Sequence, residues 1–287
     1  MSHLSVVLDN DMTTADVISH VSMYWTGGKG LFTKELDEAL LDGRVDIAVH
    51  SMKDVPTELP DGITIPINLQ REDVRDAFIS RKFSSLNELS PGSVLGTSSL
   101  RRQTQIVSRL DGVKAIQFRG NVQTRLRKLD EEQVDATMLA FAGLRRLGLE
   151  SEVTALVEPD EVVPACSQGA IGIALRQNDE QTHAALSPLN DMECHIAVTC
   201  ERAFLHRLGG SCTTPVGGHA RRVGISDTLR FDGVLARLEW NGPGPSAIRT
   251  NAEGQFSMEG AVDVGTRAAE DLLSKVPAGF LEGLLAE

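Results

Sequence analysis

The segment from Val45 to Pro56, which reads VDIAVHSMKDVP, constrains the fold of this chain more than any other. Its apolar first half contains β-branched residues and follows a helix-like stretch from Thr33 to Leu41 and a stop at Gly43, which is typical of a buried strand. Such a strand delivers its last polar residues to a loop, so we expect Asp54 just past the carboxyl end of a strand. In open α/β sheets, ligands bind at that edge.

The neighbour of Asp54 is a lysine, Lys53. A cation beside a carboxylate favours its ionised form, which makes Asp54 a candidate for stabilising positive charge or moving protons. The alternative is an ordinary surface ion pair at the end of a strand, and such pairs contribute little to stability. The segment alone does not choose between the two.

A second pattern occurs twice farther along the chain. A strand-like stretch from Val94 to Thr97 leads into the run Ser98 to Arg102, and another from Ala115 to Phe118 leads into the run Arg119 to Arg125. Hydroxyl residues in the first run can cap a helix. Both turns pass from strand to helix, and the free N–H groups and positive dipole end of such helices favour anions.

Basic residues are concentrated around these two turns. Between residues 97 and 128 there are eight Lys or Arg residues and one acid, Asp111, although the whole chain has a net charge of −12. The concentration indicates an anionic ligand, since the arginine fork pairs with carboxylates and phosphates. Nucleic acid is disfavoured because Phe118 is the only aromatic residue there. Four of the eight fit a solvated helix face equally well, namely Arg109, Lys114, Arg127 and Lys128.

Other classes of protein are disfavoured by length and composition. A chain of 287 residues suggests roughly two or three domains. The first residues show no signal or transit peptide, and no stretch approaches the roughly 20 apolar residues of a membrane span, so we expect a cytoplasmic protein without membrane contact. A glycine-rich turn from Gly27 to Phe32 presents Lys29 either on a bland mobile loop or over an anionic ligand, and it lacks the Walker spacing.

The cysteines do not suggest a disulfide framework or a metal site. There are four, Cys166, Cys194, Cys200 and Cys212, and no CxxC pair or zinc-ligand spacing. Each is either a small buried residue or a reactive thiol. Cys212 differs from the other three because it lies in a Gly/Thr/Pro-rich loop.

Together these motifs resemble one family, hydroxymethylbilane synthase, also called porphobilinogen deaminase. The two most specific matches are HSMKDVP, from His50 to Pro56, and GTSSLRR, from Gly96 to Arg102. The matches follow the family's order from about residue 27 to Gly217. The others are Gly27 to Phe32, Arg71 to Phe78, Arg119 to Val122, Thr124 to Leu126, Ala142 to Leu149, Gln168 to Ala170, and Glu201 to Phe204.

The resemblance implies an α/β fold with two doubly wound domains like those of periplasmic binding proteins and a small C-terminal α+β domain. Domain 1 would comprise residues 1–70 and 168–188, forming the side of the cleft that carries Asp54. Domain 2 would comprise residues 75–164 and form the arginine-rich side. Domain 3, residues 191–287, would carry the loop of Cys212.

The activity that the resemblance implies is that of a transferase in tetrapyrrole (porphyrin and haem) biosynthesis. Four porphobilinogen molecules are condensed head to tail, ammonia is released, and water frees the linear tetrapyrrole hydroxymethylbilane. The growing chain is anchored on a dipyrromethane cofactor held by a thioether, and Cys212 matches the anchoring cysteine. The partners would be porphobilinogen and polypyrrole intermediates, bound by a monomer that uses neither nucleic acid nor membrane.

The resemblance also assigns roles to individual residues. Asp54 would be the catalytic group, since a carboxylate can hydrogen-bond pyrrole N–H groups and stabilise the azafulvene cation left by ammonia. The residues expected to bind the cofactor are Cys212, Lys53, Ser51, Thr97, Ser98, Ser99, Arg101 and Arg102. Those expected to bind substrate are Lys29, Arg119, Gly120, Asn121, Arg125, Arg146 and Gln168.

The chain departs from the family pattern in several places. The family's opening strand and helix, with a TRxSxLAL-like motif, has no match, so either the true start lies upstream or a central strand and two site residues are missing. Trp25 replaces a lysine, Ser167 replaces a glycine, and Ser211-Cys212-Thr213 replaces Gly-Cys-Gln. The alternative function is therefore a truncated, catalytically impaired homologue that binds a carboxylate ligand. The effector domain of a transcription regulator is a weaker alternative, because no helix-turn-helix signal is attached.

Overall fold

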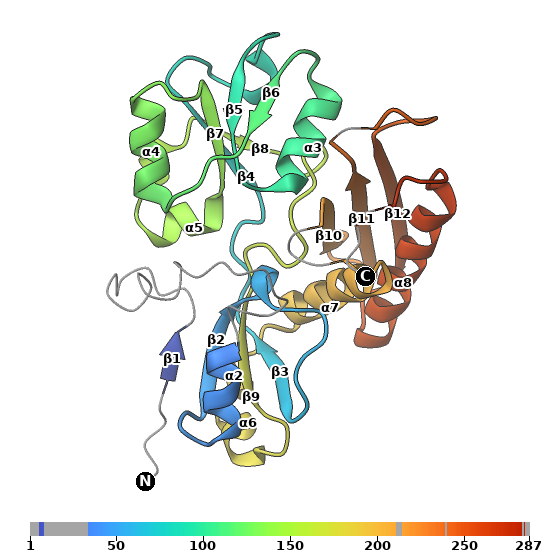
Figure 1. Ribbon diagram of the computed structural model, residues 1–287. Coiled ribbons are helices and arrows are strands. Elements are labelled where there is room, and N and C mark those ends of the chain that lie inside the picture. Colours follow the sequence, from blue (N-terminus) through green and yellow to red (C-terminus); the bar gives the residue numbers. More distant parts are fainter. Residues whose placement is uncertain (1–5, 9–33, 211–213, 239, 283, 285–287) are drawn as a thin grey trace.

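The computed structural model describes residues 6–8, 34–210, 214–238, 240–282 and 284, and these form three units, each built on one sheet (Figure 1). The expected fold class is confirmed: two units are α/β, and the third is an α+β unit with the smallest of the three sheets. No described helix combines the length and apolar character that a membrane span requires. The predicted domain boundaries remain a prediction.

The first unit contains a four-stranded sheet. Its strands, in spatial order, are β1 (Val6–Leu8), β2 (Ile47–Ser51), β9 (Ile171–Arg176) and β3 (Ile63–Asn68). Strands β1 and β2 are parallel, whereas β9 runs antiparallel to both of its neighbours. Helices α2 (Lys34–Leu41) and α6 (Glu180–Leu186) belong to this unit, and η4 (Ser187–Leu189) follows α6. The strand and the helix predicted around Gly43 are thus both confirmed.

The second unit contains a five-stranded sheet. Its strands, in spatial order, are β6 (Lys114–Ile116), β5 (Val94–Gly96), β7 (Ala136–Ala140), β4 (Asp76–Ser80) and β8 (Ala155–Val157). Strands β5, β6 and β7 are parallel, and β4 is antiparallel to β7 and β8. The helices are α3 (Leu100–Arg109), α4 (Val122–Asp130) and α5 (Phe141–Arg146), with short turns η2 (Leu86–Glu88) and η3 (Glu150–Glu152).

Two chain segments join the first unit to the second, residues 69–75 between β3 and β4 and residues 158–170 between β8 and β9 (Figure 1). The chain therefore leaves the first unit and returns to it. The two segments touch, because the N–H of Glu72 donates to the carbonyl of Gly169 at 3.0 Å. We call them the two crossover segments.

The third unit packs two long helices against an antiparallel sheet. It consists of α7 (Met192–Arg207), β10 (Val216–Arg222), β11 (Thr228–Ala236), β12 (Ala247–Gln255) and α8 (Met258–Lys275). Asp191 and Ser257 cap the two helices with their side chains. The core between helices and sheet contains Phe204, Phe231 and Phe280, all fully buried. Helix α7 also contacts the first unit, so it links the third unit to the crossover segments.

Candidate functional site

The predicted anion-binding turns converge at one edge of the five-stranded sheet. Strands β5, β6 and β7 are parallel, so their carboxyl ends lie at the same edge. Each strand is followed by arginines: Arg101 and Arg102 after β5, Arg119 and Arg125 after β6, and Arg146 after β7. Five arginines that are spread over 46 positions of sequence, from 101 to 146, therefore belong to one edge.

Asp76, a residue that the sequence analysis did not assign to the site, reaches the same edge. It is the first residue of β4, and because β4 is antiparallel to β7, Asp76 pairs with Ala140 at the end of β7. Its two carboxylate oxygens accept hydrogen bonds from the Nη2 atoms of Arg101 and Arg102, both at 2.8 Å. All three side chains are buried. An internal carboxylate therefore binds both arginines of the GTSSLRR motif.

The other bonds of Arg101 and Arg102 fix both guanidinium groups. The Nη1 atom of Arg101 donates to the carbonyl of Val163 at 2.7 Å, and that of Arg102 donates to the carbonyl of Met138 at 3.0 Å. Burial works to raise the pKa of Asp76, but the two arginines outweigh it and hold that pKa below its usual range. Burial lowers the pKa of Arg101. Two guanidinium charges face one carboxylate, so the trio has a net charge of +1.

Three buried polar atoms beside this trio have no hydrogen-bond partner among the described residues: the Nε atoms of Arg101 and Arg102 and the hydroxyl of Ser98. Neighbouring Thr97 is fully buried and its hydroxyl accepts from the N–H of Ser99 at 3.3 Å. Ser99 is the N-cap residue of α3, but its side chain makes no capping bond, so that part of the capping prediction was wrong. Unpaired buried donors are costly, and they mark where a ligand's acceptor groups would bind.

The remaining arginines form a contrasting set, which we call the open rim: Arg119, Arg125 and Arg146. Arg119 and Arg146 are exposed, and no described side chain forms an ion pair with Arg146. Arg125 is half-buried, and its Nε donates to the carbonyl of Gly120 at 2.7 Å. Burial and, next, the charge of Arg102 lower the pKa of Arg125, so the rim lies within electrostatic reach of the buried pair.

The loop between Arg119 and Arg125 has a fixed shape. Gly120 has a φ of +127°, and a Cβ there would lie 2.7 Å from the side chain of Thr124. The side chain of Asn121 caps α4 by accepting from the N–H of Thr124 at 2.8 Å. Gly120 and Asn121, predicted as substrate contacts, therefore shape the turn that presents the two arginines.

Asp54 lies where the sequence predicted, one short turn beyond β2. It ends η1 (Met52–Asp54), and the N–H of Met52 donates to the carbonyl of Ala170 in the second crossover segment at 3.0 Å. Arg202 of α7 holds the next residues, donating to the carbonyls of Val55 at 3.2 Å and Pro56 at 2.6 Å. Ser51, Lys53 and Asp54 are half-buried, so the loop is anchored while its polar side chains keep some access.

A chain of buried polar contacts joins these parts, and we call it the buried junction: Arg71, Asp76, Arg101, Arg102, Gln168 and Glu201. Arg71 makes a two-pronged ion pair with Glu201, at 2.8 and 2.9 Å, and its Nε donates to the carbonyl of Gln168 at 3.0 Å. The side-chain amide of Gln168 donates to Asp76 at 2.9 Å. Gln168, predicted as a substrate contact, therefore uses its side-chain amide for contacts inside the protein, and these contacts connect the two crossover segments.

A hollow of about 340 Å³ lies between the two α/β units beside the open rim. It is lined by residues of both crossover segments and of α5, including Glu72, Gly169 and Arg146. Across it, Arg145 of α5 forms an ion pair with Glu72 at 2.6 Å. The neighbouring arginines therefore differ, since Arg145 is already paired and Arg146 faces the hollow without an ion-pair partner among the described side chains.

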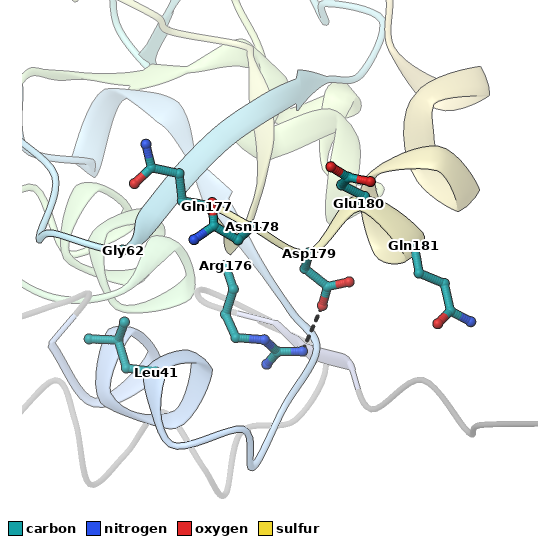
Figure 2. Close-up of a pocket in the computed structure, with 8 residues that line it drawn as sticks. All are labelled: Leu41, Gly62, Arg176, Gln177, Asn178, Asp179, Glu180 and Gln181. Carbon is teal, nitrogen blue, oxygen red and sulfur yellow. Dashed lines mark hydrogen bonds and ion pairs between the residues drawn. The ribbon is translucent and has the colours of Figure 1, made fainter.

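A second hollow, of about 570 Å³, lies on the first unit and contains none of the predicted site residues (Figure 2). Its charged centre is Arg176, which donates to Asp179 at 2.7 Å, as the dashed line in Figure 2 shows, and to Asp46 at 3.0 Å. Arg176 also donates to the carbonyls of Leu40 and Val45. The guanidinium of Arg176 thus binds groups of the first unit itself. We therefore do not assign this hollow a ligand-binding role like that of the arginine edge.

Two predicted site residues, Lys29 and Cys212, lie outside the described residues. The sequence analysis missed Asp76 and Glu201 as partners of arginines. A signal for Asp76 existed, because an aspartate directly before the apolar strand Ala77-Phe78-Ile79 is expected to be buried, and a buried carboxylate needs cationic partners. Among the part of the chain that is described, no group of side chains has the composition of a metal site.

Comparisons with known proteins show which family the chain belongs to. The family model described as "Porphobilinogen deaminase, dipyromethane cofactor binding domain" matches residues 2–184, and the model described as "Porphobilinogen deaminase, C-terminal domain" matches residues 195–274. Together they cover the two α/β units and most of the third unit. The first match includes Asp54 and every arginine of the edge.

Curated relatives are similar over most of the chain. The porphobilinogen deaminase of Oryza sativa subsp. japonica, described as chloroplastic, is 49% identical over 95% of this chain and 75% of its own length. That of Paracoccus denitrificans is 46% identical over 94% of this chain and 84% of its own. Among solved structures, a YaeC-family lipoprotein from Enterococcus faecalis V583 covers 65% of this chain with 11% identity and a TM-score of 0.41. A likeness that distant carries no information on function.

Proposed function

Because this chain belongs to the porphobilinogen deaminase family, we propose that its arginine edge binds the acetate and propionate groups of a growing polypyrrole. The enzyme is a transferase, a hydroxymethylbilane synthase of tetrapyrrole biosynthesis that condenses four porphobilinogen molecules with release of ammonia. One observation carries the proposal for the site. Five arginines belong to one sheet edge, and in its buried pair, Arg101 and Arg102, the single carboxylate of Asp76 leaves a net charge of +1.

Carboxylate recognition fits the donors that are present. Arginine pairs with carboxylates through parallel N–H bonds, and each pyrrole unit adds two carboxylates, so the product becomes more anionic with every step. The open rim offers exposed arginines on separate elements, Arg119 in the turn before α4 and Arg146 at the end of α5. Arginines on different elements can bind carboxylates that lie far apart on one extended ligand.

The enzyme uses a dipyrromethane cofactor, and the buried donors suit it. The unpaired Nε atoms of Arg101 and Arg102 and the hydroxyl of Ser98 can donate to the cofactor's carboxylates. When bound, the cofactor supplies the pyrrole end to which the first substrate unit is joined. We place its attachment at Cys212, since the other three cysteines are buried and burial raises their pKa, for Cys194 to about 12.

Asp54 is our candidate for the catalytic group. Loss of ammonia from porphobilinogen leaves a positive charge spread over the pyrrole and its methylene carbon. A carboxylate at a fixed position stabilises that charge and can accept the pyrrole N–H. The loop of Asp54 is fixed at Ala170 and by Arg202, which satisfies the need for a preorganised group.

The remaining contacts and the setting are also proposals. Lys53 and Ser51 lie next to Asp54 and Lys29 in a glycine-rich turn, so we assign them to the carboxylates nearest the reacting carbon. We expect a monomer that acts in the cytoplasm and binds neither nucleic acid nor membrane, in keeping with a net charge of −12.

The test is turnover by the purified holoenzyme, measured as porphobilinogen consumed and ammonia released. The wild-type chain should release one ammonia for each porphobilinogen consumed. Asp54→Ala should lose turnover by roughly a hundredfold or more while keeping its cofactor, because the lost group acts on the transition state. Asp61→Ala, which removes an exposed carboxylate of the same loop region, is the matched control and should keep full activity. A folded wild-type protein that binds porphobilinogen without releasing ammonia would instead be a carboxylate-binding protein.

A further inference from the structure

The partner of the arginine pair, Asp76, is unusual in serving two guanidinium groups at once. Its carboxylate is completely buried and accepts from three side chains: Arg101, Arg102 and Gln168. These donors come from α3 and from the second crossover segment, while Asp76 itself belongs to β4. One carboxylate is therefore the meeting point of three separate parts of the chain.

The contacts leave each guanidinium group a single orientation. In Arg101, Nη2 is bound to Asp76 and Nη1 to the carbonyl of Val163, whereas in Arg102 Nη1 is bound to the carbonyl of Met138. A planar group held at both Nη atoms cannot rotate, so the direction of its Nε–H is set as well. The two Nε donors, which have no partner among the described residues, are thus aimed by Asp76 and the two carbonyls.

We propose that Asp76 is a positioning residue for the polymerisation, which aims the arginine pair at the carboxylates of the bound cofactor and leaves the pair with one net positive charge. The inference rests on the proposed function and deepens it, because Asp76 then acts on catalysis through Arg101 and Arg102 without touching substrate. A carboxylate is required at this place. Asparagine would accept from one arginine and turn its own NH₂ donors toward the other.

If Asp76 is a positioning residue, its replacement should lower kcat and leave the KM for porphobilinogen nearly unchanged. The cofactor stays bound through all four additions, so misplacing it changes the position of the reacting carbon and lowers kcat. Incoming porphobilinogen is bound mainly by the open rim, so its KM stays nearly constant. A purely structural Asp76 would instead lower the fraction of folded, cofactor-loaded enzyme and leave both constants unchanged for each loaded molecule.

The experiment is steady-state kinetics on holoenzyme, with kcat expressed per bound dipyrromethane and measured well below the unfolding temperature. Asp76→Asn should lower kcat by about a hundredfold with KM within about threefold of wild type, the loss typical of a group misplaced by about 1 Å. Asp76→Glu, which keeps the charge and moves it by one methylene, should lower kcat by about tenfold. Asp73→Asn is the matched control, because Asp73 lies three residues away and its carboxylate pairs with Arg75 alone among the described side chains.

The possible results test the positioning role of Asp76 separately from the proposed activity of the enzyme. If wild-type enzyme does not turn over, the proposed function fails. If wild-type enzyme is active and Asp76→Asn and Asp76→Glu keep its kcat per bound cofactor, Asp76 is only structural and the inference is wrong. Should Asp76→Asn not fold, Asp76→Glu decides alone by the same criterion. Asp73→Asn should lose stability with kcat and KM within about twofold of wild type, and a hundredfold loss there would contradict the specific role of Asp76.

Discussion

The buried junction and the open rim contain the same kind of side chain at the same sheet edge, yet they use it differently. In the junction, Glu201 binds Arg71, and Asp76 binds Arg101 and Arg102. Less than a tenth of the surface of each of these residues is exposed, except in Arg71. In the rim, Arg119 and Arg146 are exposed. One set has its charge mostly neutralised by buried carboxylates, and the other lies at the solvent-exposed surface.

The difference shows that an arginine motif does not itself identify a ligand contact. What decides is whether the fold brings a carboxylate to the same place. Asp76 is at the edge only because β4 runs antiparallel to β7, which puts the start of one strand beside the end of the other. Junction residues should therefore affect stability first, and rim residues should affect ligand binding first.

The largest expected effect is on stability, at Glu201. Its carboxylate accepts from Arg71 twice and from the N–H groups of Ser167 and Ala220. Glu201→Ala leaves the mostly buried guanidinium of Arg71 without its carboxylate and two buried N–H groups unpaired, so we expect a loss of about 3–5 kcal/mol in the free energy of unfolding, or no folded protein. Urea unfolding followed by circular dichroism measures it.

A surface carboxylate provides the control for Glu201. Glu270 pairs with Arg207 at 3.2 Å, with both side chains about half exposed. Glu270→Ala should change the free energy of unfolding by at most about 1 kcal/mol. Equal losses in the two variants would remove the distinction between buried and exposed pairs.

The stability of the protein should also depend on pH through His219, which lies within electrostatic reach of Arg71 of the junction. Burial, and next the charges of Arg71 and Arg221, lower the pKa of this histidine to about 3, while Asp232 opposes them. Below pH 6.5 the unfolded chain takes up a proton that the folded chain refuses, so stability falls with pH from 6.5 toward 3 and is unaffected above 6.5. Between pH 6.5 and 5 we expect a loss of about 2 kcal/mol from this group.

Comparison with a non-titrating side chain isolates that contribution. Urea unfolding of wild type and of His219→Gln at pH 6.5 and at pH 5 gives the change in the free energy of unfolding with pH for each protein. The variant should lose less stability on acidification than wild type. Identical pH dependence in the two proteins would show that His219 is already protonated when folded, or that it does not contribute.

In the rim, the expected effect is on binding. Arg146→Ala should raise the KM for porphobilinogen by about tenfold, the cost of one charge-assisted pair, and change the free energy of unfolding by less than about 0.5 kcal/mol. Arg145→Ala is the matched control, because Arg145 precedes it in α5 and is already paired with Glu72. A larger KM effect for Arg145 than for Arg146 would reverse our assignment of which arginine binds ligand.

The smallest expected effect is a gain in stability at Ser167. This residue is buried, has a φ of +64°, and its hydroxyl has no partner among the described residues. Ser167→Gly should raise the free energy of unfolding by roughly 1 kcal/mol, because glycine adopts a positive φ without strain. Ser167→Ala keeps the strain and removes the hydroxyl, so it should gain less. Thermal unfolding ranks the three proteins, and a gain in alanine equal to that in glycine would exclude strain as the cause.

Local patterns predicted most of the elements. The helix-like stretch that ends at Leu41 is α2, the apolar run before Asp54 is β2, and the strand-like stretches before Ser98 and Arg119 overlap β5 and β6. These succeed because the signals lie within one turn or one strand. The capping prediction was partly right, since Ser99 is the N-cap residue of α3 but its side chain makes no capping bond.

The partners of the arginines could not be predicted in the same way. Asp76 lies 26 residues before Arg102, and Glu201 lies 130 residues after Arg71. Only sheet order and the two crossover segments bring them together. The motif residues Thr97, Ser98 and Ser99 follow β5 as predicted, but the complete burial of Thr97 depends on packing that no local pattern encodes.

We have argued that the arginine edge binds the carboxylates of a chain that grows on a covalently attached cofactor. The intact mass of the protein, purified from cells that make porphobilinogen, tests this most directly. The predicted result is an added dipyrromethane that is absent in Cys212→Ala and that grows by whole pyrrole units when porphobilinogen is added. An unmodified mass on folded, wild-type protein, or growth that persists in Cys212→Ala, would contradict it.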